Sequence, residues 1–335
     1  MEGTDLQGVF TLKEFQDGIS IKGFVENSRP KKGVIIGGGY IGVEMAESFR
    51  HAGMEVTVVE ALPRIMAIMD EDLGGIVADE LVRNKVNVIT GKKVVALKGG
   101  SDVQGVTLED GTSIDADCVL LSIGVAPNSN IAEEAGLTLG RRKAILVDRY
   151  LRTSDPGIYA AGDCATVYHR LLCDNVYIPL GLTANRQGKM CGENIIRDIS
   201  NNTLIPFPGV IGTAVTKVFG LEVAKTGIGQ AEIEQNLLRH ISSAKIKAKT
   251  LPGYFPGSSE MWVKIFFEEH TGLIKGGQIV GGPGSGLRIN TIVAAISSSM
   301  RLDELYALDA AYAPPFSPVW DPLLIAAREG MRRRV

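Results

Sequence analysis

Three glycines and one carboxylate are the residues whose types and spacing indicate chemistry. The glycines follow an apolar run, and Glu60 closes a second apolar run eighteen residues after Gly42. Gly37 allows a tight turn, Gly39 lets a phosphate approach the backbone, and Gly42 lets a helix pack closely on a strand. A carboxylate at Glu60 suits a ribose diol and would repel a 2′-phosphate. The spacing therefore predicts a dinucleotide site that prefers NADH to NADPH.

A strand, a helix and a second strand are needed to bring these residues together. The apolar residues 33–36 and 56–60 predict the two strands, with the helix between them. The pyrophosphate would then lie at the helix N-terminus, where free N–H groups and the positive end of the helix dipole favour an anion. We expect Gly38, Tyr40 and Ile41 to complete this nucleotide loop.

The bulk composition describes a globular chain that is large enough for two or three domains. Its 335 residues are 45% hydrophobic and 22% charged, which fits a substantial core. The formal net charge of −3 gives no electrostatic reason to expect nucleic acid or an anionic membrane as a partner. The sequence shows neither an apolar run of membrane-spanning length nor a signal peptide, so we expect a cytoplasmic location.

The cysteines and histidines carry no metal signal. Cys118, Cys164, Cys173 and Cys191 lack both Cys-x-x-Cys and zinc-site spacing, and the four histidines are scattered. We therefore expect no metal site, and four free thiols that are mostly buried.

The pattern of the first part of the chain predicts an α/β unit. A helix from Glu71 to Asn84 follows the second strand, and three alternating segments over 93–115 predict an antiparallel meander. A buried strand over 118–123 ends at Gly124, where we expect the chain to turn beside the nucleotide. Residues 1–30 have the pattern of a lead-in, with a short strand and a polar helix.

Two further units follow along the chain. Residues 145–148 and 157–161 have strand patterns, and residues 182–199 predict a helix that follows Pro179. From about residue 212 onward strands precede helices, which indicates an α+β domain. Strands are expected there at 214–219, 221–226, 244–249, 262–268 and 273–280, and helices at 287–300 and 321–328.

Seven segments, spread in order over nearly the whole chain, carry a resemblance to one family. They are Ile36–Ala46, Ser122–Asn128, Leu151–Asp163, Pro179–Gly188, Gly212–Gly220, Gly253–Gly257 and Tyr312–Ser317. Together they resemble the pyridine nucleotide-disulfide oxidoreductases, which use FAD and NAD. The last two segments are similar to those of one branch, which holds NADH oxidases, NADH peroxidases, coenzyme A-disulfide reductases and persulfide reductases.

This resemblance implies an overall α/β fold and its domain boundaries. Residues 1–30 would be a lead-in and a remnant of an FAD-binding domain, and residues 31–143 a Rossmann-like NAD-binding domain with a parallel sheet and an antiparallel meander. Residues 144–208 would be the C-terminal half of an FAD-binding domain of similar fold. Residues 209–335 would be an α+β dimerisation domain that forms a homodimer.

The resemblance also implies which residues hold NAD(H) and FAD. Glu44, Gly124 and Val125 would lie near the nicotinamide, and Asp163 would hydrogen-bond the ribityl chain of FAD. The remaining expected flavin contacts are Gly162, Leu180, Gly181, Thr183 and Ala184. Each also has a purely structural explanation, since Asp163 suits a turn, Glu44 suits the first turn of a helix, and Pro179 commonly precedes one.

Two tyrosines are the candidate catalytic residues. The resemblance places Tyr254 and Tyr312 at the dimer interface, reaching toward the substrate of the other subunit. A phenol there would hydrogen-bond a developing thiolate or donate a proton. The alternative is that both fill an interface, with their hydroxyl groups satisfied.

The chain departs from the family pattern at its start. Family members open with a first glycine fingerprint for FAD and a redox cysteine soon after it, and this sequence shows neither. The resemblance implies an enzyme that passes a hydride from NADH to FAD and on to a disulfide, persulfide, peroxide or oxygen. We expect this chain to be a truncated or fragmentary form, impaired unless another polypeptide supplies the missing half. The alternative is a non-catalytic NADH-binding, dimer-forming module or subunit.

Overall fold

The apolar run before the first glycine forms strand β2 (Lys32–Ile36) of a parallel sheet. The computed structural model describes residues 1–334. The sheet has five parallel strands, in the order β1 (Val9–Thr11), β8 (Cys118–Leu121), β2, β3 (Glu55–Glu60) and β4 (Val86–Thr90). A parallel sheet is normally covered on both faces, and successive side chains of a strand point to opposite faces.

Helices cover one face of this sheet, and the predicted meander covers the other. Ile35 and Val58 pack with helices α1 (Phe15–Ser28), α2 (Tyr40–His51) and α3 (Glu71–Arg83). Their neighbours Ile36 and Val59 pack with the second sheet. That antiparallel sheet consists of β5 (Val94–Gly99), β6 (Val103–Leu108) and β7 (Ser113–Asp115), so the meander is confirmed.

The lead-in packs on this first unit. Strand β1 pairs with β8 along the edge of the parallel sheet, and Ile21 of α1 lies in the core beside Val43. The physical reason is that the edge of β8 offers free backbone groups, which a short parallel strand satisfies. The expected assignment of residues 1–30 to a remnant of an FAD-binding domain stays a prediction.

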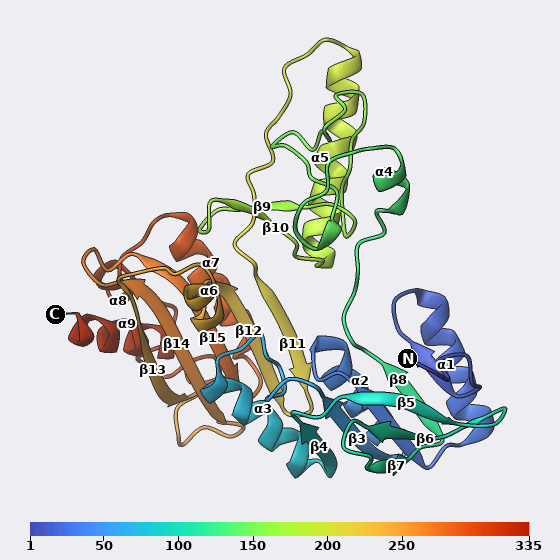
Figure 1. Ribbon diagram of the computed structural model, residues 1–335. Helices are drawn as coiled ribbons and strands as arrows, with labels where there is room; N and C mark the ends of the chain where they lie inside the picture. The colour runs from blue at the N-terminus through green and yellow to red at the C-terminus, as the bar shows by residue number, and fades with distance from the viewer. Residues whose placement is uncertain (335) are drawn as a thin grey trace.

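The second unit stands apart from the other two and is built around one long helix (Figure 1). It contains α4 (Asn130–Glu134), the short turn η1 (Arg141–Lys143), β9 (Val167–His169), β10 (Asp174–Val176) and α5 (Gly181–Ile199). The helix predicted over 182–199 is therefore confirmed. The strands predicted at 145–148 and 157–161 are wrong, because these segments make only isolated bridges such as Ile145 with Ala165. A strand pattern becomes a ladder only where a partner strand lies beside it.

The third unit is an antiparallel sheet with helices packed on it. Its strands lie in the order β11 (Ala214–Val218), β12 (Leu221–Gly227), β15 (Ile274–Gly281), β14 (Glu260–Glu268) and β13 (Ile241–Lys249). The helical elements are α6 (Gln230–Gln235), η2 (Gly286–Arg288), α7 (Ile289–Ser297), α8 (Leu302–Tyr306) and α9 (Pro322–Arg333). All five predicted strands are confirmed, and α6 and α8 were not predicted.

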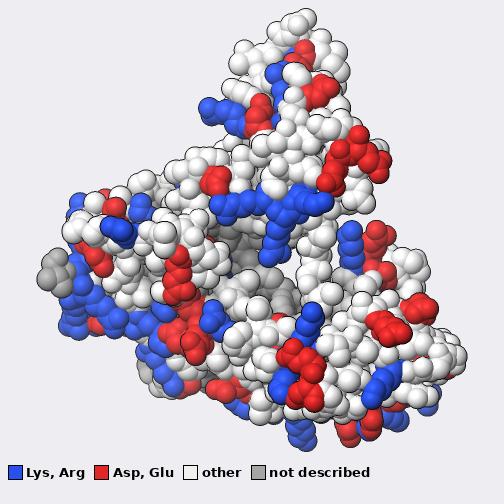
Figure 2. Space-filling view, in the orientation of Figure 1, with Lys and Arg blue, Asp and Glu red and all other residues white. Residues whose placement is uncertain are grey.

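The three units surround a central hollow. Figure 2 shows this hollow, with Lys and Arg side chains along the wall formed by the second unit. The first and third units are also joined directly, since Glu47 of α2 forms an ion pair of 2.6 Å with Lys217 and accepts a hydrogen bond from the Phe219 amide at 2.8 Å. None of the helices over residues 1–334 combines the length and the apolar character needed to cross a bilayer.

Candidate functional site

The glycine loop has the geometry that its sequence predicts. Gly37 adopts φ of 109°, a conformation that residues with a side chain rarely adopt, and its amide donates to the Val59 carbonyl at 2.8 Å. A Cβ on Gly42 would lie 2.0 Å from the Gly37 carbonyl oxygen, so the helix and the turn touch. A Cβ on Gly39 would meet nothing within 4 Å. The space above Gly39 at the start of α2 is therefore open to a ligand.

Glu60 lies beside this loop at the end of β3. Its Oε2 accepts a hydrogen bond from the Gly38 amide at 2.7 Å, and its Oε1 accepts one from the Leu62 amide at 2.8 Å. Each carboxylate oxygen can accept a second hydrogen bond, so the group keeps capacity for a diol. The structure thus brings the acid and the glycines together as predicted. The open space above Gly39 and the spare acceptors of Glu60 fit the adenosine and pyrophosphate parts of a dinucleotide.

The first turn of α2 faces the third unit. Tyr40 is partly buried, and burial, together with the charges of Glu232 and Glu44, raises the pKa of its phenol. Glu44 is exposed and accepts a hydrogen bond from the Thr216 hydroxyl of β11. Its contact in the structure is therefore with the third unit, and its expected place near a nicotinamide stays a prediction.

The turn at Gly162 is attached to the start of α5. Gly162 has φ of 85°, and its amide donates to Gln187 Oε1 at 3.0 Å. Gln187 is 1% exposed, and its Nε2 donates to the Thr166 carbonyl at 3.0 Å. This buried amide, which the sequence did not single out, holds the turn against the helix and leaves the next residue, Asp163, exposed.

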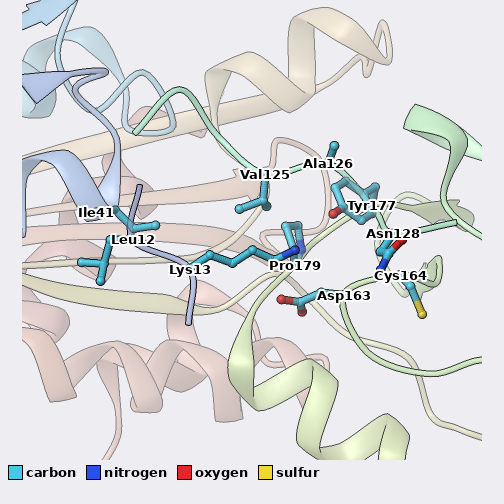
Figure 3. A pocket seen from close by; sticks show the side chains of 10 residues that line it. All are labelled: Leu12, Lys13, Ile41, Val125, Ala126, Asn128, Asp163, Cys164, Tyr177 and Pro179. Carbon is cyan, nitrogen blue, oxygen red and sulfur yellow. The ribbon is translucent and has the colours of Figure 1, made fainter. Parts of the chain in front are cut away.

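A cleft of about 240 Å³ lies between the first and second units (Figure 3). Ile41 and Val125 line it from the first unit, and Asp163 and Pro179 line it from the second. In Figure 3 the Lys13 side chain extends between the units toward Pro179 and Asp163. Residues expected at the two cofactors therefore meet in one place.

The cleft also contains a hydroxyl group that lacks a partner. The oxygen of Tyr177 is buried, and it makes no hydrogen bond within the described residues. Burial and the nearby charge of Asp163 raise the pKa of this phenol. A buried polar atom usually has a partner, so this one suits a polar ligand. The Tyr177 hydroxyl, the start of α5 and the Lys and Arg side chains along the wall of the hollow together fit an anionic, hydroxyl-rich cofactor such as FAD (Figure 2).

The other predicted flavin residues lie around this end of α5. Leu180 is the N-cap residue and Gly181 begins the helix, directly after Pro179 of the cleft. Thr183 is 8% exposed and packs inside the unit. Ala184 lies 3.6 Å from the position of a Cβ on Gly162, so it supports the turn. Gly124, with φ of 97°, precedes Val125 at the other side of the cleft.

The two candidate catalytic tyrosines lie together on the third unit. Tyr254 is 76% exposed and Tyr312 is 46% exposed. A hydrogen-bonding contact with Tyr254 raises the pKa of the Tyr312 phenol. The two phenols therefore lie close together, and their expected role at a dimer interface stays a prediction. Exposed Phe316, Val319 and Trp320 follow Tyr312 in the same segment, which therefore presents several apolar side chains to solvent.

Arg288 holds the two tyrosine segments in place, and no sequence pattern pointed to it. Its Nη2 donates to the Thr250 carbonyl at 3.2 Å and to the Phe316 carbonyl at 3.0 Å. Its Nε donates to Asp321 Oδ2 at 2.9 Å, and both side chains are largely buried. One guanidinium group therefore connects the segment before Tyr254 with the one after Tyr312.

The metal and thiol expectations have separate outcomes. Among residues 1–334, no group of three or more His, Cys, Asp or Glu side chains has the arrangement of a metal site. All four cysteines are free. Cys118 and Cys191 are buried, Cys164 is half-buried, and Cys173 is exposed.

Comparison with known families identifies the fold. The model of the pyridine nucleotide-disulphide oxidoreductase family matches residues 4–188, and the model of that family's dimerisation domain matches residues 213–323. The chain belongs to this family. It is thus a member of an oxidoreductase family, and its third unit is the family's dimerisation domain. Both agree with the resemblance seen in the sequence.

Individual relatives match nearly the whole chain. The NAD(P)H sulfur oxidoreductase (CoA-dependent) of Pyrococcus furiosus is 36% identical over 98% of this chain and 72% of its own length. The NADH oxidase of Methanocaldococcus jannaschii is 35% identical over 99% of this chain and 72% of its own length.

Two solved structures have the same fold. One is the reduced Bacillus anthracis CoADR-RHD, with a TM-score of 0.91 and 33% identity over 98% of this chain. The other is an NAD-dependent persulfide reductase from A. fulgidus, with a TM-score of 0.91 and 34% identity over the full chain. This chain spans 58% of the first and 61% of the second.

Proposed function

We propose that the chain acts as an FAD-dependent oxidoreductase that binds NADH and forms a dimer. The observation that carries this proposal is the cleft of Figure 3, where Ile41 and Val125 of the nucleotide unit face Asp163 and Pro179. When bound there, FAD would accept the hydride of NADH and pass electrons to an acceptor. Relatives named for sulfur, persulfide and CoA-disulfide chemistry favour a disulfide or persulfide acceptor, and the relatives named NADH oxidase favour oxygen or peroxide.

In this proposal the chain's own residues bind and orient the cofactors. Gly37 to Gly42 and Glu60 hold the pyrophosphate and the adenosine ribose, and Gly124 and Val125 shape the nicotinamide side. The turn at Gly162 presents Asp163 to the ribityl hydroxyls, while the start of α5 faces the flavin ring. Holding the two reacting groups in one cleft is the main contribution that the protein makes to hydride transfer.

The boundaries between the functional parts are also proposals. We assign residues 31–143, with the lead-in packed on them, to NAD binding. Residues 144–208 belong to the FAD-binding domain, and residues 209–335 form the dimerisation domain. The exposed tyrosine pair and the exposed apolar side chains after Tyr312 support a homodimer in which Tyr254 and Tyr312 reach the substrate of the other subunit. Four free cysteines suit a reducing compartment such as the cytoplasm.

Cofactor titration tests the proposal. The purified chain should bind FAD and show flavin absorbance, and anaerobic NADH should bleach that absorbance. A colourless protein that still binds NADH would support the alternative, a non-catalytic NADH-binding module. Absence of saturable binding of either cofactor would refute both.

A further inference from the structure

The loop after Glu60 is fastened to the dimerisation domain at several points. This loop, residues 61–70, is called the adenosine loop here, because it begins next to the acid expected to bind the adenosine ribose. It also contacts the glycine loop directly. The Met66 amide donates to the Gly38 carbonyl at 2.9 Å, and the Leu62 amide donates to Glu60 Oε1. Its position therefore sets the orientation of the Glu60 carboxylate.

A buried acid ends the adenosine loop. Asp70 is 5% exposed, and its Oδ2 lies 2.6 Å from Nζ of Lys264, which comes from β14. Gln278 of β15 is fully buried and contacts Asp70 twice. Its Nε2 donates to Asp70 Oδ1 at 2.8 Å, and its Oε1 accepts from the Asp70 amide at 2.9 Å. A buried carboxylate needs such partners, so this end of the loop has one favourable position.

A second buried cation holds the middle of the loop. Lys225 of β12 is 7% exposed, and its Nζ donates to the Ile68 carbonyl at 3.1 Å. The same ammonium group forms an ion pair of 2.6 Å with Glu232. Just beyond the loop, Lys245 of β13 lies 2.8 Å from Asp72 in a more exposed pair. Three strands of the dimerisation domain, β12, β14 and β15, thus share in holding the adenosine loop, and β13 holds Asp72 just beyond it.

We propose that Lys225, Lys264 and Gln278, here called the clamp, set the affinity for the adenosine half of NADH. The clamp residues are positioning residues, since they contact the loop and not the nucleotide site itself. This inference rests on the proposed NADH site. It adds that the dimerisation domain determines how well that site is formed, in addition to any role in pairing subunits.

Binding measurements on the full chain test the clamp. In Lys264→Met the loop loses its main ion pair, and the Glu60 carboxylate loses its fixed orientation. One hydrogen bond to a charged group corresponds to about tenfold or more in affinity, so the Kd for NADH should rise about tenfold. Because the loop serves only the adenosine half, the Kd for ADP-ribose should rise by the same factor. Lys264→Arg keeps the charge and should restore most of the affinity.

Lys217→Met is the matched control. Lys217 crosses the same boundary between units, but it pairs with Glu47 of α2 and not with the adenosine loop. Its replacement should leave both affinities unchanged. If Lys264→Met fails to fold by circular dichroism, Lys225→Met gives a second test within the clamp, because it removes the hydrogen bond to the Ile68 carbonyl, with an expected rise of about threefold.

Each outcome decides between the two proposals. Wild-type Kd values in Lys264→Met, or equal losses in Lys264→Met and Lys217→Met, would overturn the clamp and leave the NADH site intact. A weakened affinity for NADH with unchanged affinity for ADP-ribose would also overturn it. A wild-type chain that binds neither ligand would remove the proposed function, and the clamp with it.

Discussion

Two alanine substitutions in the glycine loop separate the fold of the site from its function. A Cβ on Gly37 would lie 2.4 Å from the Ser122 carbonyl oxygen, in a backbone conformation with φ of 109°. An unfavourable φ costs about 1–3 kcal/mol, and overpacking costs about 1–3 kcal/mol more. We therefore expect Gly37→Ala to lower the free energy of unfolding of the first unit by about 3 kcal/mol. A Cβ on Gly39 meets nothing within 4 Å, and its φ of −81° suits any residue.

Gly39→Ala should therefore keep the stability within about 1 kcal/mol of the wild type, the cost of a poorer N-cap residue. It should still weaken NADH at least tenfold, or about 1.4 kcal/mol, because the methyl group occupies the space of the pyrophosphate. Urea unfolding followed by far-UV circular dichroism measures the stability, and nicotinamide fluorescence measures the binding. Unchanged affinity in Gly39→Ala would show that the open space above this residue does not hold the nucleotide, and the argument for the site would fail.

Three further predictions concern the rest of the chain. Arg288→Met removes the ion-pair partner of Asp321, which keeps only its hydrogen bonds from Ser317 and the Leu323 amide. Unfolding of the third unit, followed by the fluorescence of the two tryptophans that lie in it, should then require about 3 kcal/mol less. A loss below about 1 kcal/mol contradicts the bridging role. Burial lowers the pKa of His169 from its ordinary value of 6.5, so in acid the unfolded chain binds more protons than the folded chain. The free energy of unfolding should therefore be full above about pH 7 and fall as the pH drops through 6.5. His169→Gln should flatten this slope. Burial raises the pKa of the Cys118 thiol to about 12, whereas Cys173 is exposed. An alkylating reagent should therefore modify Cys173 first and Cys118 only after unfolding. Mass analysis of the peptides would show this order.

Local patterns in the sequence were sufficient for two of the three units. The run 33–36 and the acid-ended run 56–60 predicted β2 and β3, because a buried parallel strand is apolar on both faces. The meander and the five strands of the dimerisation domain were predicted from alternation and from the Gly and Asp-Gly breaks between them. The prediction of these elements needed only their own residues and the breaks beside them, although their partner strands can lie far away in the chain.

The second unit shows the limit of that reasoning. Residues 145–148 and 157–161 have the composition of strands, yet a ladder also requires a partner at the correct distance. The short helices α6 and α8 were missed for a related reason, since a helix of five or six residues shows too little periodicity to be recognised. The same holds for residues 1–30, whose strand pattern could not reveal which sheet it would join.

The candidate site divides in the same way. Residues that act through the backbone, such as Gly37 and Gly39, could be predicted, because their chemistry follows from what a side chain would obstruct. Gln187 and Arg288 could not, since each is an ordinary polar residue until the fold places carbonyl groups around it. The sequence signal for such residues is weak, because it lies in burial and not in spacing.

Asp70 shows most clearly why the relation between the units lies outside sequence reasoning. In the sequence it is a favourable acid just before a helix, and nothing near it suggests a buried ion pair. Its partners Lys264 and Gln278 lie about two hundred residues away on a different unit. Removing a carboxylate of this kind from water is favourable only if its partners are already in place, so it ties the two units to one arrangement. The loop beside Glu60 is therefore held by residues that its own domain does not contain.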